Sequence, residues 1–182
     1  MKSILLSILL LAAFGSGVAQ KGKLFPDLEG ESLTHGSINI PSETMGKYTL
    51  VGIALSKKSE GSLKTWFNPV YQQLIKEPDA GSLFAFSYDV NVYFIPMVTG
   101  AKRPAYQKVM DKVEKDVDKQ LHPHVLFYKG SLNTYKDALN ITDKNVPYFY
   151  LIDKEGKIVY ATKGAYSDSK LQKIVDELPF DE

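Results

Sequence analysis

The chain contains no cysteine among its 182 residues. Disulfide bonds, thiolate nucleophiles and lipid attachment to a cysteine are therefore excluded. Arginine is almost as scarce, because Arg103 is the only one and the other basic residues are lysines. This scarcity argues against planar, bidentate recognition of phosphates or bases. The 22 basic and 21 acidic residues nearly balance, so we expect no nucleic-acid partner.

Two common classes of motif are also missing. The sequence has no G-x-S-x-G turn, and its nearest approach, Gly61-Ser62, lacks the rest of the pattern of a serine hydrolase. It has no glycine-rich loop of the P-loop or dinucleotide-binding kind. We therefore expect no cofactor, and an enzyme would have to use a chemistry other than thiol chemistry.

Residues 1–19 have the three parts of a secretory signal. Lys2 gives a basic start, an apolar run from Ile4 to Phe14 follows, and small residues lead to Ala19. The run of about 11 residues is short of the roughly 20 that cross a bilayer as a helix. We predict cleavage between Ala19 and Gln20, export to the periplasm or the exterior, and no membrane span afterwards. Retention of the segment as an anchor is the alternative.

The rest of the chain, residues 20–182, predicts a single α/β domain. Apolar runs indicate buried strands, and apolar residues at helical spacing indicate helices between and after them. The strands are expected at 48–55, 90–98 and 124–128, and the helices at 63–74 (kinked at Pro69), 104–117, 131–139 and 167–178. Ahead of them, residues 25–33 predict an extended piece that turns at Gly30, and residues 37–41 an edge strand. Such alternation predicts a parallel sheet with helices on both faces.

A β-hairpin is expected near the C-terminal end and makes this sheet mixed. Residues 148–152 and 158–161 are its two strands, and Asp153-Lys154-Glu155-Gly156 has the composition of a turn. Gly156 can take the positive φ that such a turn needs. Pro147 stands at the start of the first strand, where its missing N–H costs no central hydrogen bond.

This order resembles the thioredoxin-like fold, in its exported, peroxiredoxin-related form. The resemblance covers roughly residues 24–180. It depends on Phe25-Pro26-Asp27-Leu28, on Gly46-Lys47 before the first core strand, and on the run from Val146 to Ile158, which is similar to the family's cis-proline strand and hairpin. A weaker similarity, from Phe25 to Phe67, is to mitochondrial ATP-synthase assembly factors with a degenerate thioredoxin-like fold. These factors assist assembly.

The chain departs from the redox members at the position of their cysteines. Counting from Gly46-Lys47 puts the family's cysteine positions near Lys58 and Gly61, and counting from Pro69 puts them near Gly61 and Lys64. None of these residues carries sulfur, and the thiolate is the nucleophile of that chemistry. Disulfide exchange and cysteine-peroxidase activity are therefore excluded.

Two stretches are candidates for binding a partner. The loop Lys57-Lys58-Ser59-Glu60-Gly61-Ser62 precedes a predicted helix, whose free N–H groups and dipole favour an anion. The alternative is an ordinary capped and solvated loop, with Ser59 or Ser62 as the cap. Val146-Pro147 is the second candidate, because the resemblance implies a cis Pro147 that turns the Val146 backbone toward an extended partner peptide. Without the resemblance a trans, purely structural proline is expected.

His122-Pro123-His124 is a weak candidate for a metal site. Two histidines at i and i+2 of a strand lie on one face. His35 is the only other histidine, and an ordinary junction between a loop and a strand explains the pair equally well. The tyrosines on the expected strands are read as core packing, with an exposed binding patch as the alternative.

The sequence thus predicts an exported, redox-inactive thioredoxin-like domain that acts as a protein-binding or assembly-assisting module, with a protein or an extended peptide as its partner. The candidate residues are Lys57, Lys58, Ser59, Gly61, Val146 and Pro147. A non-thiol enzyme or metal-binding protein that uses His122 and His124, and a purely structural domain, are the alternatives.

Overall fold

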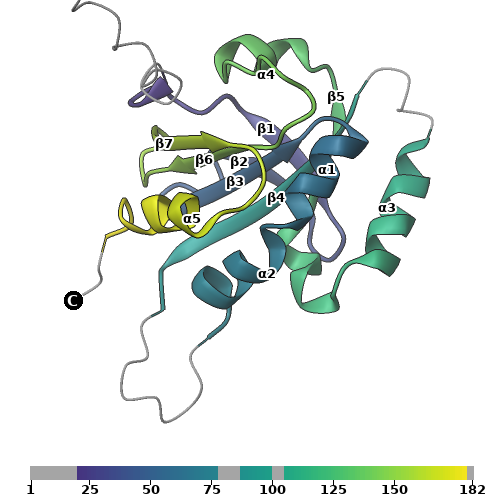
Figure 1. Ribbon diagram of the computed structural model, residues 1–182. Coiled ribbons are helices and arrows are strands. Elements are labelled where there is room, and N and C mark those ends of the chain that lie inside the picture. Colours follow the sequence, from purple (N-terminus) through teal and green to yellow (C-terminus); the bar gives the residue numbers. More distant parts are fainter. Residues whose placement is uncertain (1–19, 78–86, 100–104, 180–182) are drawn as a thin grey trace, which may run out of the picture.

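The protein is described from a computed structural model that covers residues 20–77, 87–99 and 105–179. The predicted signal segment, Gly100 and Pro104 lie outside these residues. One seven-stranded mixed sheet forms the centre, in the order β2-β1-β5-β4-β3-β6-β7 (Figure 1). Its strands are β1 (Leu28–Ser32), β2 (Gly36–Ile40), β3 (Tyr48–Ala54), β4 (Val90–Thr99), β5 (Leu126–Gly130), β6 (Tyr148–Ile152) and β7 (Ile158–Lys163).

The expected alternation of strands and helices is confirmed. β3, β4 and β5 run parallel, and β6 returns antiparallel to β3. The helical segments are α1 (Lys57–Lys64), α2 (Phe67–Val70), the π-helix η2 (Tyr71–Ile75), α3 (Tyr106–Asp116), the 3-10 helix η4 (Lys119–His124), α4 (Asn133–Ala138) and α5 (Asp168–Val175). None of the helices in the described residues has the length and apolar character that crossing a bilayer requires.

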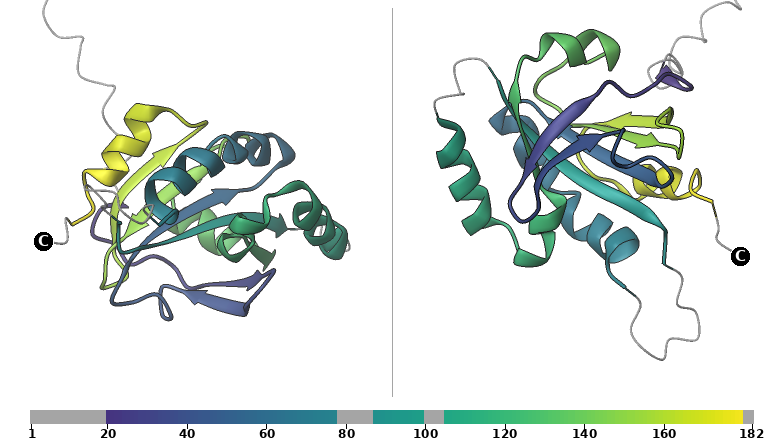
Figure 2. Two further views of the ribbon diagram at one scale, coloured as in Figure 1. Left: turned by 90° about the horizontal axis from the view of Figure 1, so that it is seen from below. Right: turned by 180° about the vertical axis from the view of Figure 1, so that it is seen from behind.

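Side chains alternate between two cores, one on each face of the sheet. From β3, Leu50 and Ala54 enter the core under α1, α2, α3 and α5, whereas Val51 and Ile53 enter the core under α4. From β6, Phe149 joins the first core, and Tyr148 and Tyr150 join the second. The views in Figure 2 show the helices spread over both faces. Both faces of β3 are buried, which confirms the prediction of a central strand.

The hairpin β6–β7 has the predicted turn. The Oδ1 atom of Asp153 accepts hydrogen bonds from the N–H groups of Glu155 (3.0 Å) and Lys157 (2.8 Å). Gly156 has φ +82°, the left-handed conformation that glycine adopts without steric cost. The second strand extends to Lys163, two residues beyond the prediction.

Two local predictions at the N-terminal side are wrong. Gly30 does not turn the chain, because it lies inside β1 opposite Ile38, and the reversal to β2 comes after Ser32. The helix predicted over 63–74 begins earlier, at Lys57, and is broken into α1, α2 and a π-helix. The break falls at Thr65 and Trp66, four and three residues before Pro69, because a proline ring clashes with the carbonyl four residues earlier.

Candidate functional site

The stretch expected to be a loop, residues 57–62, is the first part of α1. Ser56 caps this helix: its Oγ accepts a hydrogen bond from the Ser59 N–H (3.2 Å), and the Ser59 Oγ accepts one from the Ser56 N–H (2.8 Å). The Ser59 Oγ also accepts from the Leu55 N–H (2.8 Å), and the Ser59 side chain is fully buried. Ser59 is thus occupied inside the protein, and neither it nor Ser62 is the cap.

The remaining candidates on α1 face solvent. Lys57, Lys58 and Gly61 are exposed, and no atom lies within 4 Å of the place where a Gly61 side chain would begin. An exposed helix start with two lysines is an anion-favouring surface, as the sequence suggested. The lysine side chains on this surface are long and solvated, so the surface is shallow.

Pro147 is not the cis proline that the resemblance implied. The only cis peptide bond in the described residues joins Ile40 and Pro41, so the Val146–Pro147 bond is trans. Pro147 is buried, and its carbonyl accepts a hydrogen bond from the Gly164 N–H (2.8 Å). Val146 is half-buried. The backbone that the family offers to a partner is therefore partly used within the domain.

The two candidate stretches nevertheless meet at one end of the sheet. Ile53, near the end of β3, lies opposite Tyr148, the first residue of β6. The start of α1 follows β3 by a few residues, and Val146-Pro147 precedes β6 directly, so both leave the sheet at the same end (Figure 1). We call this end, with Lys57, Lys58, Gly61, Val146 and Pro147, the α1 end.

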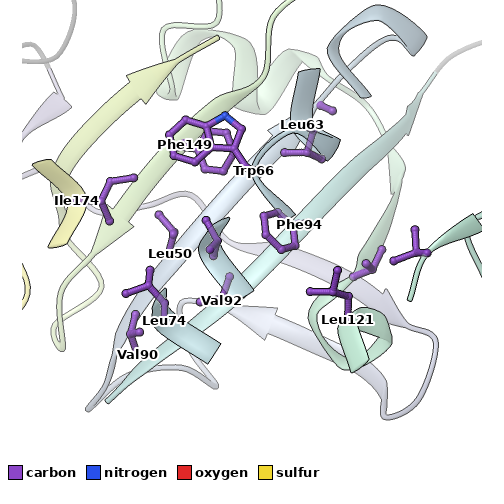
Figure 3. Packing of buried hydrophobic residues seen from close by; sticks show 14 of the residues in the cluster. Leu50, Leu63, Trp66, Leu74, Val90, Val92, Phe94, Leu121, Phe149 and Ile174 are labelled. Carbon is purple, nitrogen blue, oxygen red and sulfur yellow. The ribbon is translucent and has the colours of Figure 1, made fainter. Parts of the chain in front are cut away.

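A cluster of aromatic side chains packs around Trp66 beneath the α1 end. The indole stacks on Phe149 with ring centroids 4.0 Å apart, and its Nε1 donates to the Gly164 carbonyl (3.0 Å). Tyr166 contacts the indole edge-on, and its N–H donates to the Thr65 Oγ1 (3.0 Å). Figure 3 shows Trp66 over Phe149, with Leu63 nearby. This cluster fastens the α1–α2 junction to the segment after β7 and leaves no cavity at that place.

Sequence reasoning placed Trp66 on the buried helix face but missed these hydrogen bonds. Gly164 and Tyr166 are about a hundred residues away in the chain, and no local pattern connects residues that far apart. The signal that was available is that Trp66 is the only tryptophan. A buried indole needs an acceptor for its N–H.

Two of the strand tyrosines, Tyr148 and Tyr150, are buried in the core and are not part of an exposed binding patch. The Tyr148 hydroxyl accepts hydrogen bonds from the N–H groups of Thr142 (3.1 Å) and Asp143 (2.9 Å). The Tyr150 hydroxyl donates to the Leu139 carbonyl (2.8 Å), and burial raises the pKa of Tyr150 above its usual value. These bonds fix the loop between α4 and β6, which leads to Val146.

His122 and His124 do not form the arrangement that a metal needs. They belong to the 3-10 helix η4 rather than to a strand, which begins only at Leu126. The His122 Nε2 lies 2.9 Å from the Val117 carbonyl, and the His124 Nδ1 lies 3.0 Å from the Val92 carbonyl. Burial lowers the pKa of His124. The described residues contain no group of three or more ligating side chains, so the geometric argument for a metal site fails.

The clearest hollows on the described surface lie away from the α1 end. One of about 180 Å³ opens between α2 and η4, and a much smaller one lies beside Lys154 and Leu178. Neither is lined by the candidate residues. The first is lined by Lys64, Phe67, Asn68, Tyr71, Asp116, Val117, Asp118, Gln120 and Leu121. Neither of these two hollows therefore lies at the α1 end.

Comparison with known proteins supports the fold and gives the family. Similar solved structures include a DsbF homologue from Corynebacterium diphtheriae (14% identity, TM-score 0.57, covering 93% of this chain and 98% of that one) and a secreted thiol-disulfide isomerase from Corynebacterium glutamicum (15%, 0.57, 93% and 97%). The mitochondrial 2-Cys peroxiredoxin from Plasmodium falciparum is also similar (15%, 0.53, 87% and 92%). At these identities the likeness shows the fold alone, which is thioredoxin-like.

No curated protein sequence matches the chain significantly. The model of one family, described as ATP10 protein, matches residues 18–177, which is most of the chain. The weaker of the two sequence resemblances agrees with this match. The chain belongs to the ATP10 protein family.

Proposed function

We propose that this protein is an exported binding module that assists the assembly of another protein and carries no redox activity of its own. The observation that carries the proposal is the α1 end, where an exposed helix start and the half-buried Val146 leave the same end of the sheet. A thioredoxin-like protein that lacks cysteine keeps this surface but has no thiol to react there.

The charge at the α1 end favours an acidic partner segment. Lys57 and Lys58 are exposed in the first turn of α1, and Lys163, also exposed, lies opposite Tyr148 at the same end of the sheet. Lys144 adds a fourth exposed lysine shortly before Val146. A carboxylate near a helix start gains about 0.3–1 kcal/mol from the dipole alone, and each nearby lysine adds to this. A weak, reversible complex follows, which suits a protein that helps assembly and then leaves.

The backbone contact would differ from that of a cis-proline protein. Because the Pro147 carbonyl already accepts from the Gly164 N–H and the Asn145 N–H already donates to the Asp143 Oδ1 (2.8 Å), an extended partner would pair mainly with Val146. We expect such pairing to be short, so that the lysines supply the specificity.

Membership of the family supports a role in assembly. The composition of the N-terminal segment supports export. The ATP10 family is associated with ATP synthase assembly, so a subunit of a membrane-bound complex is the partner class that we propose. A mitochondrial location would agree with that association. However, transit peptides are rich in arginine, and residues 1–19 contain none. We therefore favour export.

Site-specific crosslinking tests the proposal. A photo-crosslinker placed at Gly61 should capture a partner from the native envelope fraction, and one at Lys112 on α3 should not. Reversing two charges, Lys57→Glu with Lys58→Glu, should lower capture about tenfold or more, since two ionic contacts change from attraction to repulsion.

The matched control reverses Lys108 and Lys115 on α3, which changes the net charge equally. Pro147→Ala is a second comparison, because it alters the entry to β6 without altering charge. Equal capture by all variants would refute binding at the α1 end and leave a purely structural domain. Capture that is unchanged when Lys57 and Lys58 are reversed would refute the proposal that the partner segment is acidic.

A further inference from the structure

The end of the sheet opposite the α1 end carries exposed apolar side chains. Among the described residues, Leu24 and Met45 are the large hydrophobic side chains that stay exposed, at 65% and 55%. Single exposed apolar residues are ordinary, but these two flank one turn. Two exposed apolar side chains beside the same turn therefore require an explanation.

Backbone contacts hold both residues against the β6–β7 turn. Leu24 forms a β-bridge with Lys157, and the next residue, Phe25, donates its N–H to the Gly156 carbonyl (2.9 Å). On the other side, the Gly46 N–H donates to the Lys154 carbonyl (2.9 Å). The Met45 Cε lies 3.6 Å from the position that a Gly156 Cβ would occupy. Leu24 and Met45 thus stand on either side of the same tight turn.

Three exposed lysines, Lys23, Lys154 and Lys157, lie around this pair, and within the described residues none of them forms an ion pair. Two exposed carboxylates, Glu43 and Asp89, also lie at this end, and Asp89 is paired with Lys47 (2.6 Å). Glu155 is the one carboxylate on the tip of the turn that is fully exposed, because Asp153 is half-buried and its Oδ1 accepts two backbone hydrogen bonds. We call Leu24, Met45, Lys23, Lys154 and Lys157 the Leu24–Met45 face.

The apolar N-terminal run joins the domain at this face. Residues 4–14 are nearly all apolar, and the described chain starts at Gln20, four residues before Leu24. Figure 1 and the right view of Figure 2 both show this start beside the β6–β7 hairpin, with α3 on the far side of the molecule. If this segment is kept as an anchor, it holds the Leu24–Met45 face next to the bilayer.

We propose that the Leu24–Met45 face docks on the surface of an anionic membrane. Leu24 and Met45 enter the boundary between headgroups and acyl chains, and the three lysines contact the anionic headgroups. Apolar insertion and lysine contacts each give weak attachment alone and reinforce one another when combined. The interaction does not need the α1 end, which faces the other way and stays free for a partner.

Vesicle binding with the full chain tests this proposal. Because the protein has no cysteine, one fluorophore can be attached at a single introduced cysteine. Ser42→Cys places it close to Met45, and Ser131→Cys places it on the β5–α4 loop as an equally exposed control. With vesicles that contain phosphatidylglycerol, a lipid-bound quencher should quench the label at position 42 and not that at position 131.

Charge and apolar variants separate the contributions. Lys23→Glu with Lys157→Glu should weaken binding to phosphatidylglycerol vesicles about tenfold or more, whereas Lys108→Glu with Lys115→Glu should weaken it far less. Leu24→Ser with Met45→Ser should reduce binding that persists at high salt, because apolar insertion is not screened.

Three results would overturn the proposal. Equal quenching at positions 42 and 131 would mean that the N-terminal run tethers the chain without orienting it. Equal loss in both charge variants would mean non-specific attraction. Protection of position 42 in native envelopes but not in any vesicle would assign the face to a protein instead of a lipid surface.

Discussion

The two ends of β6 differ in whether large apolar side chains are buried or exposed. At the α1 end, Trp66 and Phe149 are fully buried, and Lys57, Lys58, Lys144 and Lys163 are among the exposed residues. At the turn end, Leu24 and Met45 are exposed near Lys23, Lys154 and Lys157. Exposed lysines occur at both ends and do not distinguish them. The exposure of large apolar side chains does, and it agrees with the two proposals, a polar partner at one end and a membrane surface at the other.

The largest expected effect comes from the cluster that closes the α1 end. Trp66→Ala removes the stack on Phe149 and the hydrogen bond to Gly164, and should lower the free energy of unfolding by about 3–5 kcal/mol. Trp66→Phe keeps an aromatic ring and should cost clearly less. Urea unfolding measures both. A loss below about 1 kcal/mol for Trp66→Ala would show that the α1 end is not fastened by this residue.

Ser59→Ala should come next. It leaves the Leu55 N–H, at a fully packed position, without its acceptor, and removes half of the reciprocal cap. We expect a loss of about 1–3 kcal/mol. Ser62→Ala, in the same helix, is the control and should be close to neutral. If both cost the same in urea unfolding, Ser59 has no special role at the start of α1.

Two glycines allow the same substitution at both ends. Gly156→Ala meets a positive φ and places a Cβ 3.1 Å from the Pro41 ring, so it should cost about 1–2 kcal/mol. Gly61→Ala enters an exposed helix position with open space and should stabilise by about 0.5–1 kcal/mol. Thermal unfolding shows whether each substitution lowers or raises the stability. A change in the same direction at both positions would contradict this contrast between the ends.

A small effect that depends on pH is expected from Tyr150, which lies between the ends. Tyr150→Phe loses the hydrogen bond to the Leu139 carbonyl and should cost about 1 kcal/mol at neutral pH. Because burial raises the pKa of Tyr150 in the folded state, its contribution is complete below about pH 10, where the unfolded tyrosine titrates, and is lost as the pH rises further.

Unfolding measured as a function of pH checks this sign. The wild-type protein should lose stability above about pH 10 more steeply than Tyr150→Phe. Identical slopes in the two proteins would mean that Tyr150 ionises as freely in the folded state as in the unfolded state.

Periodicity and turn chemistry were sufficient to predict the fold. Leu171, Ile174 and Val175 marked one face of the last helix, and the structure buries all three. Asp153 and Gly156 were enough to predict the hairpin turn, because that turn is made from its own residues. The resemblance of the sequence to thioredoxin-like proteins also agrees with the similar solved structures.

The site was less predictable because its details depend on contacts between distant residues. Pro147 follows a trans peptide bond, and its carbonyl accepts a hydrogen bond from the Gly164 N–H across the β6–β7 hairpin. The start of α1 at Lys57 depends on the reciprocal hydrogen bonds between Ser56 and Ser59, whereas the sequence analysis considered only Ser59 and Ser62 as caps. His122 and His124 lie in a 3-10 helix whose carbonyl partners come in part from β4. Local patterns carry no information on such partners.

The pairing of the first described residues with β7 has a consequence for biosynthesis. The Gly22 N–H donates to the Ile158 carbonyl, and the Ile158 N–H donates to the Lys23 carbonyl. These partners are nearly a whole chain apart, so the sheet edge cannot be completed until synthesis has almost ended. Gly22 and Lys23 therefore lack these partners until Ile158 has been synthesised, which delays the completion of this edge.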